Sequence, residues 1–148
     1  MHGLFLNLVT ATVMMTWTVS VHFFGIVALL RLLSAHSHHV DGYSEVLRQI
    51  MLLIFAVLGI VALHTIEIWS YALVYIAVGA LKGFEPALYF STVSFTTLGF
   101  GDIVLDPAWR ILSAIEGANG LILFGWSTAF LISLMRKLRA LEHDWLER

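Results

Sequence analysis

The clearest chemical feature of the sequence is the run Thr96–Asp102, which reads TTLGFGD. Gly99 and Gly101 are separated by one residue, and two glycines so placed do not continue a helix comfortably. Residues 85–96 before them predict a short helix with Pro86 in its first turn, too short to cross a membrane. Because bare backbone at membrane depth must be buried by protein or line a watery cavity, this order predicts a re-entrant loop of the kind found in transport proteins.

Ionisable side chains inside apolar stretches are a second feature. His64 and Glu67 are three residues apart and share one helix face. They can bond to hydroxyls of the short helix and stiffen the loop, or lie at the membrane interface near Trp69. Glu116 can accept hydrogen bonds from the short helix or face a cavity and attract cations. The first position is favoured for Glu116, with Asn119 sharing its network.

The composition places the chain in a membrane. Apolar residues make up 59% of the 148 residues and charged residues 12%, and the mean hydropathy is +0.89. Soluble domains contain about 45–50% apolar residues and about 25% charged residues. A formal net charge of −2 excludes a basic nucleic-acid-binding surface. Cysteine is absent, and no nucleophile–base set, metal motif or phosphate loop occurs, so we expect neither an enzyme nor a cofactor.

Three apolar stretches are long enough to span a bilayer, over residues 4–33, 49–81 and 110–135. With the re-entrant segment they predict an all-α membrane protein with three transmembrane helices. Six basic residues lie on the side of the carboxyl terminus and two on the other side. The six are Arg31, Arg48, Arg136, Lys137, Arg139 and Arg148, and the two are Lys82 and Arg110. The positive-inside rule then predicts a cytoplasmic carboxyl terminus and an external amino terminus.

The run Thr97–Asp102 resembles the selectivity-filter signature of the potassium channel superfamily, usually written TVGYGD. The resemblance covers roughly residues 49–135 and implies a pore domain of outer helix, pore helix, filter and inner helix. It implies a homotetramer that conducts K⁺ passively, with four chains supplying backbone carbonyls. The filter residues would be Thr97, Leu98, Gly99, Phe100 and Gly101, with K⁺ as permeant ligand at the first four. Leu98 and Phe100 replace the usual valine and tyrosine, which alters packing behind the filter and leaves the coordinating atoms unchanged.

The resemblance also implies residues that support the filter. Tyr89 and Phe90 match the aromatic cuff of the family's pore helix, and Thr96 precedes the signature threonine. Asp102 is expected to meet Tyr89. A pore-helix glutamate that pairs with this aspartate in one bacterial branch is replaced here by Val93.

The third span is similar to the inner helix of bacterial inward rectifiers. Gly120 matches the gating hinge, and Phe124 and Thr128 match cavity positions. Residues 136–148 predict a short, amphipathic cytoplasmic tail.

Residues 1–48 predict an extra transmembrane helix and a cytoplasmic loop, as in three-span bacterial channels. We expect the helix to pack outside the pore, with Gly25 and other small residues allowing close contact. The sequence leaves open whether this helix binds membrane lipid, a neighbouring subunit or another protein. In the loop, a solvated surface is favoured over a metal or proton sensor for the cluster His36, His38 and His39.

A potassium-selective channel of a bacterial inner membrane is the leading hypothesis. A weakly selective cation channel is the first alternative, because Leu98, Phe100 and Val93 depart from the usual pattern. The second alternative is a non-conducting membrane subunit.

Overall fold

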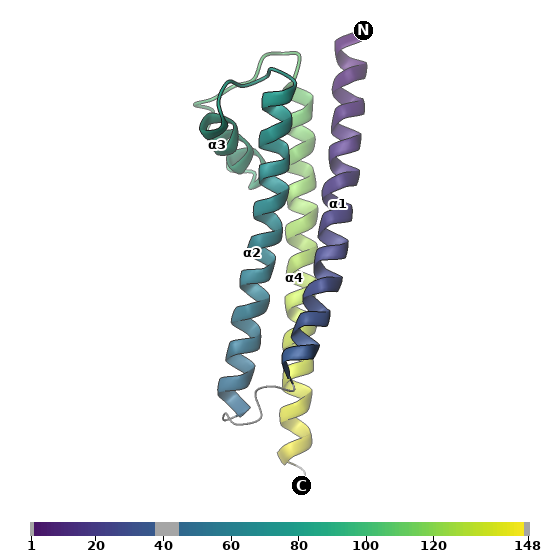
Figure 1. Cartoon of the computed structure of the whole chain (residues 1–148), viewed down its shortest axis with the longest axis vertical. Coiled ribbons are helices and arrows are strands. Elements are labelled where there is room, and N and C mark those ends of the chain that lie inside the picture. Colours follow the sequence, from purple (N-terminus) through teal and green to yellow (C-terminus); the bar gives the residue numbers. More distant parts are fainter. Residues whose placement is uncertain (1, 38–44, 147–148) are drawn as a thin grey trace.

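The computed structural model describes residues 2–37 and 45–146, with side chains over residues 3–35 and 46–138. Its elements are α1 (His2–Ser37), α2 (Glu45–Ala77), α3 (Phe84–Phe95) and α4 (Arg110–Leu146). The helices α1, α2 and α4 run alongside one another, and the short α3 lies near the end that holds the amino terminus (Figure 1). The all-helical architecture is confirmed, and all three long helices are apolar enough to cross a membrane.

The helix α4 is longer than the span predicted from the sequence. Its 37 residues continue from Arg110 through the predicted tail. At 1.5 Å per residue it measures about 55 Å, whereas the hydrocarbon core is about 30 Å thick. Thus the third span and the start of the tail form one rod that extends beyond the membrane.

Two glycines in left-handed conformation reverse the chain between α2 and α3. Gly79 has φ of 72° and Gly83 has φ of 89°. The amide groups of Ala80 and Leu81 both donate to the carbonyl of Tyr75, which closes the end of α2. The helix α3 starts at Phe84, one residue before the predicted start, and turns the chain back toward the bundle.

Small residues allow the extra helix α1 to approach α2 closely. A Cβ atom at Gly25 would lie 2.1 Å from Leu63 Cδ2, and one at Gly59 would lie 2.6 Å from Leu29 Cδ1. Each glycine therefore receives a leucine of the facing helix. Contacts join α1 to α2 and α4, and within the described residues none joins α1 to α3. The helix α1 therefore packs on α2 and α4, and Asn7 near its start donates to the carbonyl of Ala108 in the loop that precedes α4.

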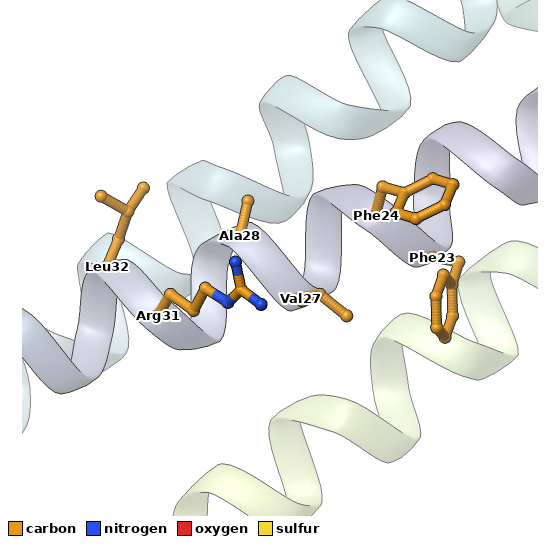
Figure 2. Close-up of a pocket in the computed structure, with 6 residues that line it drawn as sticks. All are labelled: Phe23, Phe24, Val27, Ala28, Arg31 and Leu32. Atoms are coloured by element: carbon orange, nitrogen blue, oxygen red, sulfur yellow. The ribbon is translucent and has the colours of Figure 1, made fainter.

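The outer face of α1 carries an open groove (Figure 2). Its lining is apolar except for one guanidinium, and consists of Phe23, Phe24, Val27, Ala28, Arg31 and Leu32. Phe24 is 68% exposed in the single chain. This groove therefore offers apolar surface and one positive charge to the surroundings of the helix.

Candidate functional site

We call residues Thr97–Asp102, which follow the end of α3, the filter segment. Hydrogen bonds fasten the start of this segment to the last turn of α3. The amide of Thr97 donates to the carbonyl of Ser94 at 3.0 Å. The amides of Leu98 and Gly99 both donate to the carbonyl of Val93, at 3.0 and 3.3 Å. Three successive N–H groups are therefore tied to the helix, which leaves carbonyls of the segment available to a ligand.

The backbone of the filter segment alternates in handedness. Thr97, Gly99 and Gly101 have φ of 61°, 58° and 78°, and the residues between them do not have positive φ. This alternation turns successive peptide groups toward one side, whereas a regular strand turns them to opposite sides. Glycine adopts positive φ without strain, but a β-branched threonine does not. The strained threonine marks the segment as a functional one, since such outliers persist only where the surroundings impose them.

The far end of the filter segment is fastened to α3. The hydroxyl of Tyr89 donates to Asp102 Oδ2 at 2.7 Å, as the sequence predicts. This hydrogen bond holds the pKa of the Asp102 carboxyl below its ordinary value and raises that of the Tyr89 phenol. Leu98 and Phe100 lie between the backbone bonds at the start of the segment and the Tyr89–Asp102 bond at its end. Their side chains are 60% and 65% exposed, so in one chain they lack a packed environment.

A buried carboxylate supports the middle of α3. Glu116 of α4 is fully buried and accepts a hydrogen bond of 2.6 Å from Ser91 of α3. It accepts another of 2.5 Å from the hydroxyl of Tyr75 of α2. The prediction that Glu116 faces the short helix and accepts from a hydroxyl is confirmed. The predicted partner Asn119 does not join this network, and donates instead to Thr18 of α1 at 2.7 Å.

The helix α4 contacts the carboxyl end of α3 through two glycines. A Cβ atom at Gly120 would lie 2.0 Å from the carbonyl oxygen of Phe95, and one at Gly117 would lie 3.1 Å from that of Ser94. Gly120, expected as a gating hinge, lies inside the uninterrupted helix α4. In this structure its missing side chain makes room for the residue that precedes Thr96 and the filter segment.

The remaining predicted positions on α4 divide between two faces. Thr128 is exposed, and its hydroxyl donates to the carbonyl of Phe124 at 2.9 Å. Phe124, expected on the cavity, is half-buried in the chain, and its ring lies 4.5 Å from the His64 ring and 5.6 Å from the Phe95 ring. Of the predicted aromatic cuff, Phe90 is buried and its ring lies 5.2 Å from that of Tyr75. The helical spacing alone did not show which way these rings turn.

His64 and Glu67 bond to partners other than the predicted hydroxyls of α3. Glu67 Oε2 lies 2.8 Å from His64 Nδ1, and Glu67 Oε1 lies 2.9 Å from Nδ1 of His22 on α1. His64 Nε2 lies 3.0 Å from the hydroxyl of Ser127 on α4. The contact of His64 with α3 is through the ring of Phe95, at 5.8 Å between centroids.

His22 and Tyr75 are the main site residues that the sequence reading missed. A histidine inside an apolar helix is the same signal that singled out His64, so His22 was open to the same argument. The bond of Tyr75 to Glu116 depends on the packing of α2 against α4, which no local pattern of the sequence shows. Of the loop cluster, His38 and His39 lie outside the described residues, as does the side chain of His36.

The comparisons with known proteins give one match. A family model described as an ion channel matches residues 50–137, which is more than half of the chain. No curated protein and no solved structure matches the chain. The matched range includes α2, α3, the filter segment and most of α4, and leaves α1 outside.

Proposed function

Because the chain belongs to the ion channel family, we propose that it is a potassium-selective channel whose filter is Thr97–Gly101. The observation that carries the proposal is the alternating backbone of this segment, with positive φ at Thr97, Gly99 and Gly101. Its tied N–H groups and free carbonyls suit a dehydrated cation, since K⁺ channels replace water of hydration by rings of backbone carbonyls. Thr97 would add a hydroxyl ring at the inner mouth.

The active form we propose is a homotetramer. One chain gives one set of carbonyls, and a ring around an axis requires several identical sets. The exposed side chains of Leu98 and Phe100 are in accord with this, because they would pack against neighbouring chains. A native mass measurement in detergent should give four 16.5-kDa chains.

We further propose that the amino terminus is external and the carboxyl terminus cytoplasmic, in a bacterial inner membrane. The amino terminus and α3 lie near one end of the bundle and α4 ends at the other (Figure 1). Lys82 precedes α3 and Arg110 starts α4, so both lie near the filter segment. The order of the helices along the chain assigns the six other basic residues of the sequence to the opposite side of the membrane. On α1, the groove with Arg31 suits an anionic membrane lipid.

Reversal potentials test the selectivity. Purified protein would be placed in planar bilayers with potassium on one side and sodium on the other, and we expect reversal near the potassium equilibrium potential. Gly99→Ala should abolish the selectivity, because Gly99 has φ of 58°. Gly3→Ala is the matched control, since nothing lies within 4 Å of its added methyl group. Reversal near zero with clear current would replace the proposal by the weakly selective cation channel, which the replacements at Leu98, Phe100 and Val93 favour.

A further inference from the structure

Four buried side chains form a closed ring of contacts at the middle of the bundle. We call this set the histidine ring: His22 of α1, His64 and Glu67 of α2, and Ser127 of α4. The carboxylate of Glu67 bridges the two Nδ1 atoms, at 2.9 Å to His22 and 2.8 Å to His64. On the other side, the Ser127 hydroxyl lies 3.0 Å from His64 Nε2 and 3.4 Å from His22 Nε2. Each of the three long helices thus supplies at least one member.

The histidine ring is enclosed on all sides. His22 and Glu67 are fully buried, His64 is 7% exposed and Ser127 is 4% exposed. The ring of Trp126 lies 5.4 Å from that of His22, and the ring of Phe124 lies 4.5 Å from that of His64. In such surroundings a net charge is costly, and a polar atom without a hydrogen bond is costly too.

Few other polar groups face the histidine ring. Tyr71 of α2 lies one turn beyond Glu67, and its hydroxyl accepts from Asn119 of α4 at 3.3 Å. From α1, Thr18 joins the same amide of Asn119, at 2.7 Å. From α3 the contact is the Phe95 ring. Among the described residues, the other buried carboxylate is Glu116, which lies about three helical turns from Ser127 and is bound by Ser91 and Tyr75.

The contacts of the histidine ring can be counted in hydrogens. Four contacts need four hydrogens, and the hydroxyl of Ser127 supplies one. Two neutral imidazoles and an ionised carboxylate supply only two more, so one contact would lack a hydrogen and the set would carry a charge of −1. One added proton fills the fourth contact and brings the net charge to zero. The protonation state that gives every contact of the histidine ring a hydrogen is therefore also the state with no net charge.

We infer that the histidine ring is a binding site for one exchangeable proton, and that this proton fastens the extra helix α1 to the inner helix α4. In the arrangement that we propose, Glu67 accepts from both Nδ1–H groups and the added proton lies on the Nε2 atom that donates to the Ser127 hydroxyl. When it is lost, the longest contact, between His22 and Ser127, is the first to open. The site thus couples the protonation of the histidine ring to the position of α1 against α4, the helix that follows the filter segment. The inference does not depend on which ion the channel selects.

Glu67→Gln is the decisive substitution, because glutamine completes the same ring without an added proton. Its amide oxygen accepts from one Nδ1–H, and its amide nitrogen donates to the other Nδ1. The remaining contacts through Ser127 are then filled by neutral imidazoles. The variant should keep the ring and lose its response to pH.

The first measurement counts hydrogens by ¹⁵N NMR of the full chain labelled at histidine, in nanodiscs at pH 7. Signals of His22 and His64 are assigned by comparison with His22→Gln and His64→Gln. We expect hydrogens on three of the four ring nitrogens in the wild type and on two in Glu67→Gln. Two in the wild type, together with an ionised Glu67 in the ¹³C carboxyl signal, would overturn the proposal, because the added proton would then be absent.

The second measurement follows the distance between α1 and α4. The sequence has no cysteine, so two cysteines that replace Leu30 on α1 and Met135 on α4 in the same chain are the only sites that a spin label can modify. Both positions are exposed. Labelled chains are diluted with unlabelled ones. As the pH is raised from 7, we expect the distance distribution of the wild type to shift to longer values, and that of Glu67→Gln to stay unchanged. Glu85→Gln, which removes an exposed carboxylate on α3, should behave as the wild type.

Two further outcomes would overturn the proposal. One is an equal shift with pH in the wild type and in Glu67→Gln, which would place the titrating group elsewhere. The other is stoichiometric binding of Zn²⁺ to the wild type that Glu67→Gln abolishes, because two histidines and a carboxylate are also a zinc ligand set. That result would assign the site to a metal ion in place of a proton.

Discussion

The contact between Gly120 and the end of α3 makes Gly120→Ala a sharp test of how the filter is supported. The added Cβ would lie 2.0 Å from the carbonyl oxygen of Phe95, 2.9 Å from its carbon and 3.1 Å from its Cδ1. A Cβ rarely approaches any heavy atom within about 3 Å, and the first two of these atoms belong to backbone, so α3 and α4 must separate by about 1 Å. The separation falls one residue before Thr96, where the filter segment is attached.

Two opposing energies set the expected magnitude. Alanine is better than glycine inside a helix by about 1 kcal/mol. Overpacking of this kind costs about 1–3 kcal/mol. Gly125→Ala is the matched control, because the same helix offers open space around residue 125, with nothing within 4 Å in the chain. Gly120→Ala should therefore be less stable than Gly125→Ala by about 1–3 kcal/mol.

The assay compares the midpoint of thermal dissociation of the assembled protein and the reversal potential of both variants. We expect a lower midpoint and a weaker potassium preference for Gly120→Ala alone. Equal midpoints together with unchanged selectivity would refute the contact argument. A change in open probability alone would instead support the hinge role that the sequence resemblance implies.

Three other substitutions test separate contacts. Tyr89→Phe removes the hydrogen bond that lowers the pKa of Asp102. Because that bond favours the ionised carboxyl, Asp102 of the wild type stays ionised as the pH falls to 3.8, its ordinary pKa, and in the variant it should take up its proton at a higher pH than in the wild type; equal titration of the two carboxyls by ¹³C NMR would contradict the contact. Tyr75→Phe leaves the buried Glu116 with one donor fewer, and thermal unfolding should show a loss of about 1–3 kcal/mol, while an unchanged midpoint would contradict the burial argument. Arg31→Gln should reduce the anionic lipid that copurifies, measured by native mass spectrometry; equal retention would exclude the groove on α1 as the site.

The sequence predicted the elements well, because hydropathy and glycine spacing are local signals. The start of α4 at Arg110 and the bond between Tyr89 and Asp102 are confirmed, and Glu116 accepts a hydrogen bond from the short helix α3 as predicted. The partners of His64 and Glu67 were not predicted. They come from helices 45 or more residues away in sequence, and helical periodicity does not tell which faces of separate helices meet.

The histidine ring also bears on how the chain enters the membrane. During synthesis α1 emerges first, and His22 then has no partner within its own helix. A charged residue at the centre of an isolated spanning helix costs about 2.5–3.5 kcal/mol on insertion, and α2 brings the ionisable pair His64 and Glu67. Glu67 has His64 as a partner within α2, but His22 gains its contact with Glu67 only when α1 and α2 pair, and Ser127 arrives later with α4. Insertion of α1 and α2 as a hairpin, before the pore loop has formed, is thus the order that the buried polar groups impose.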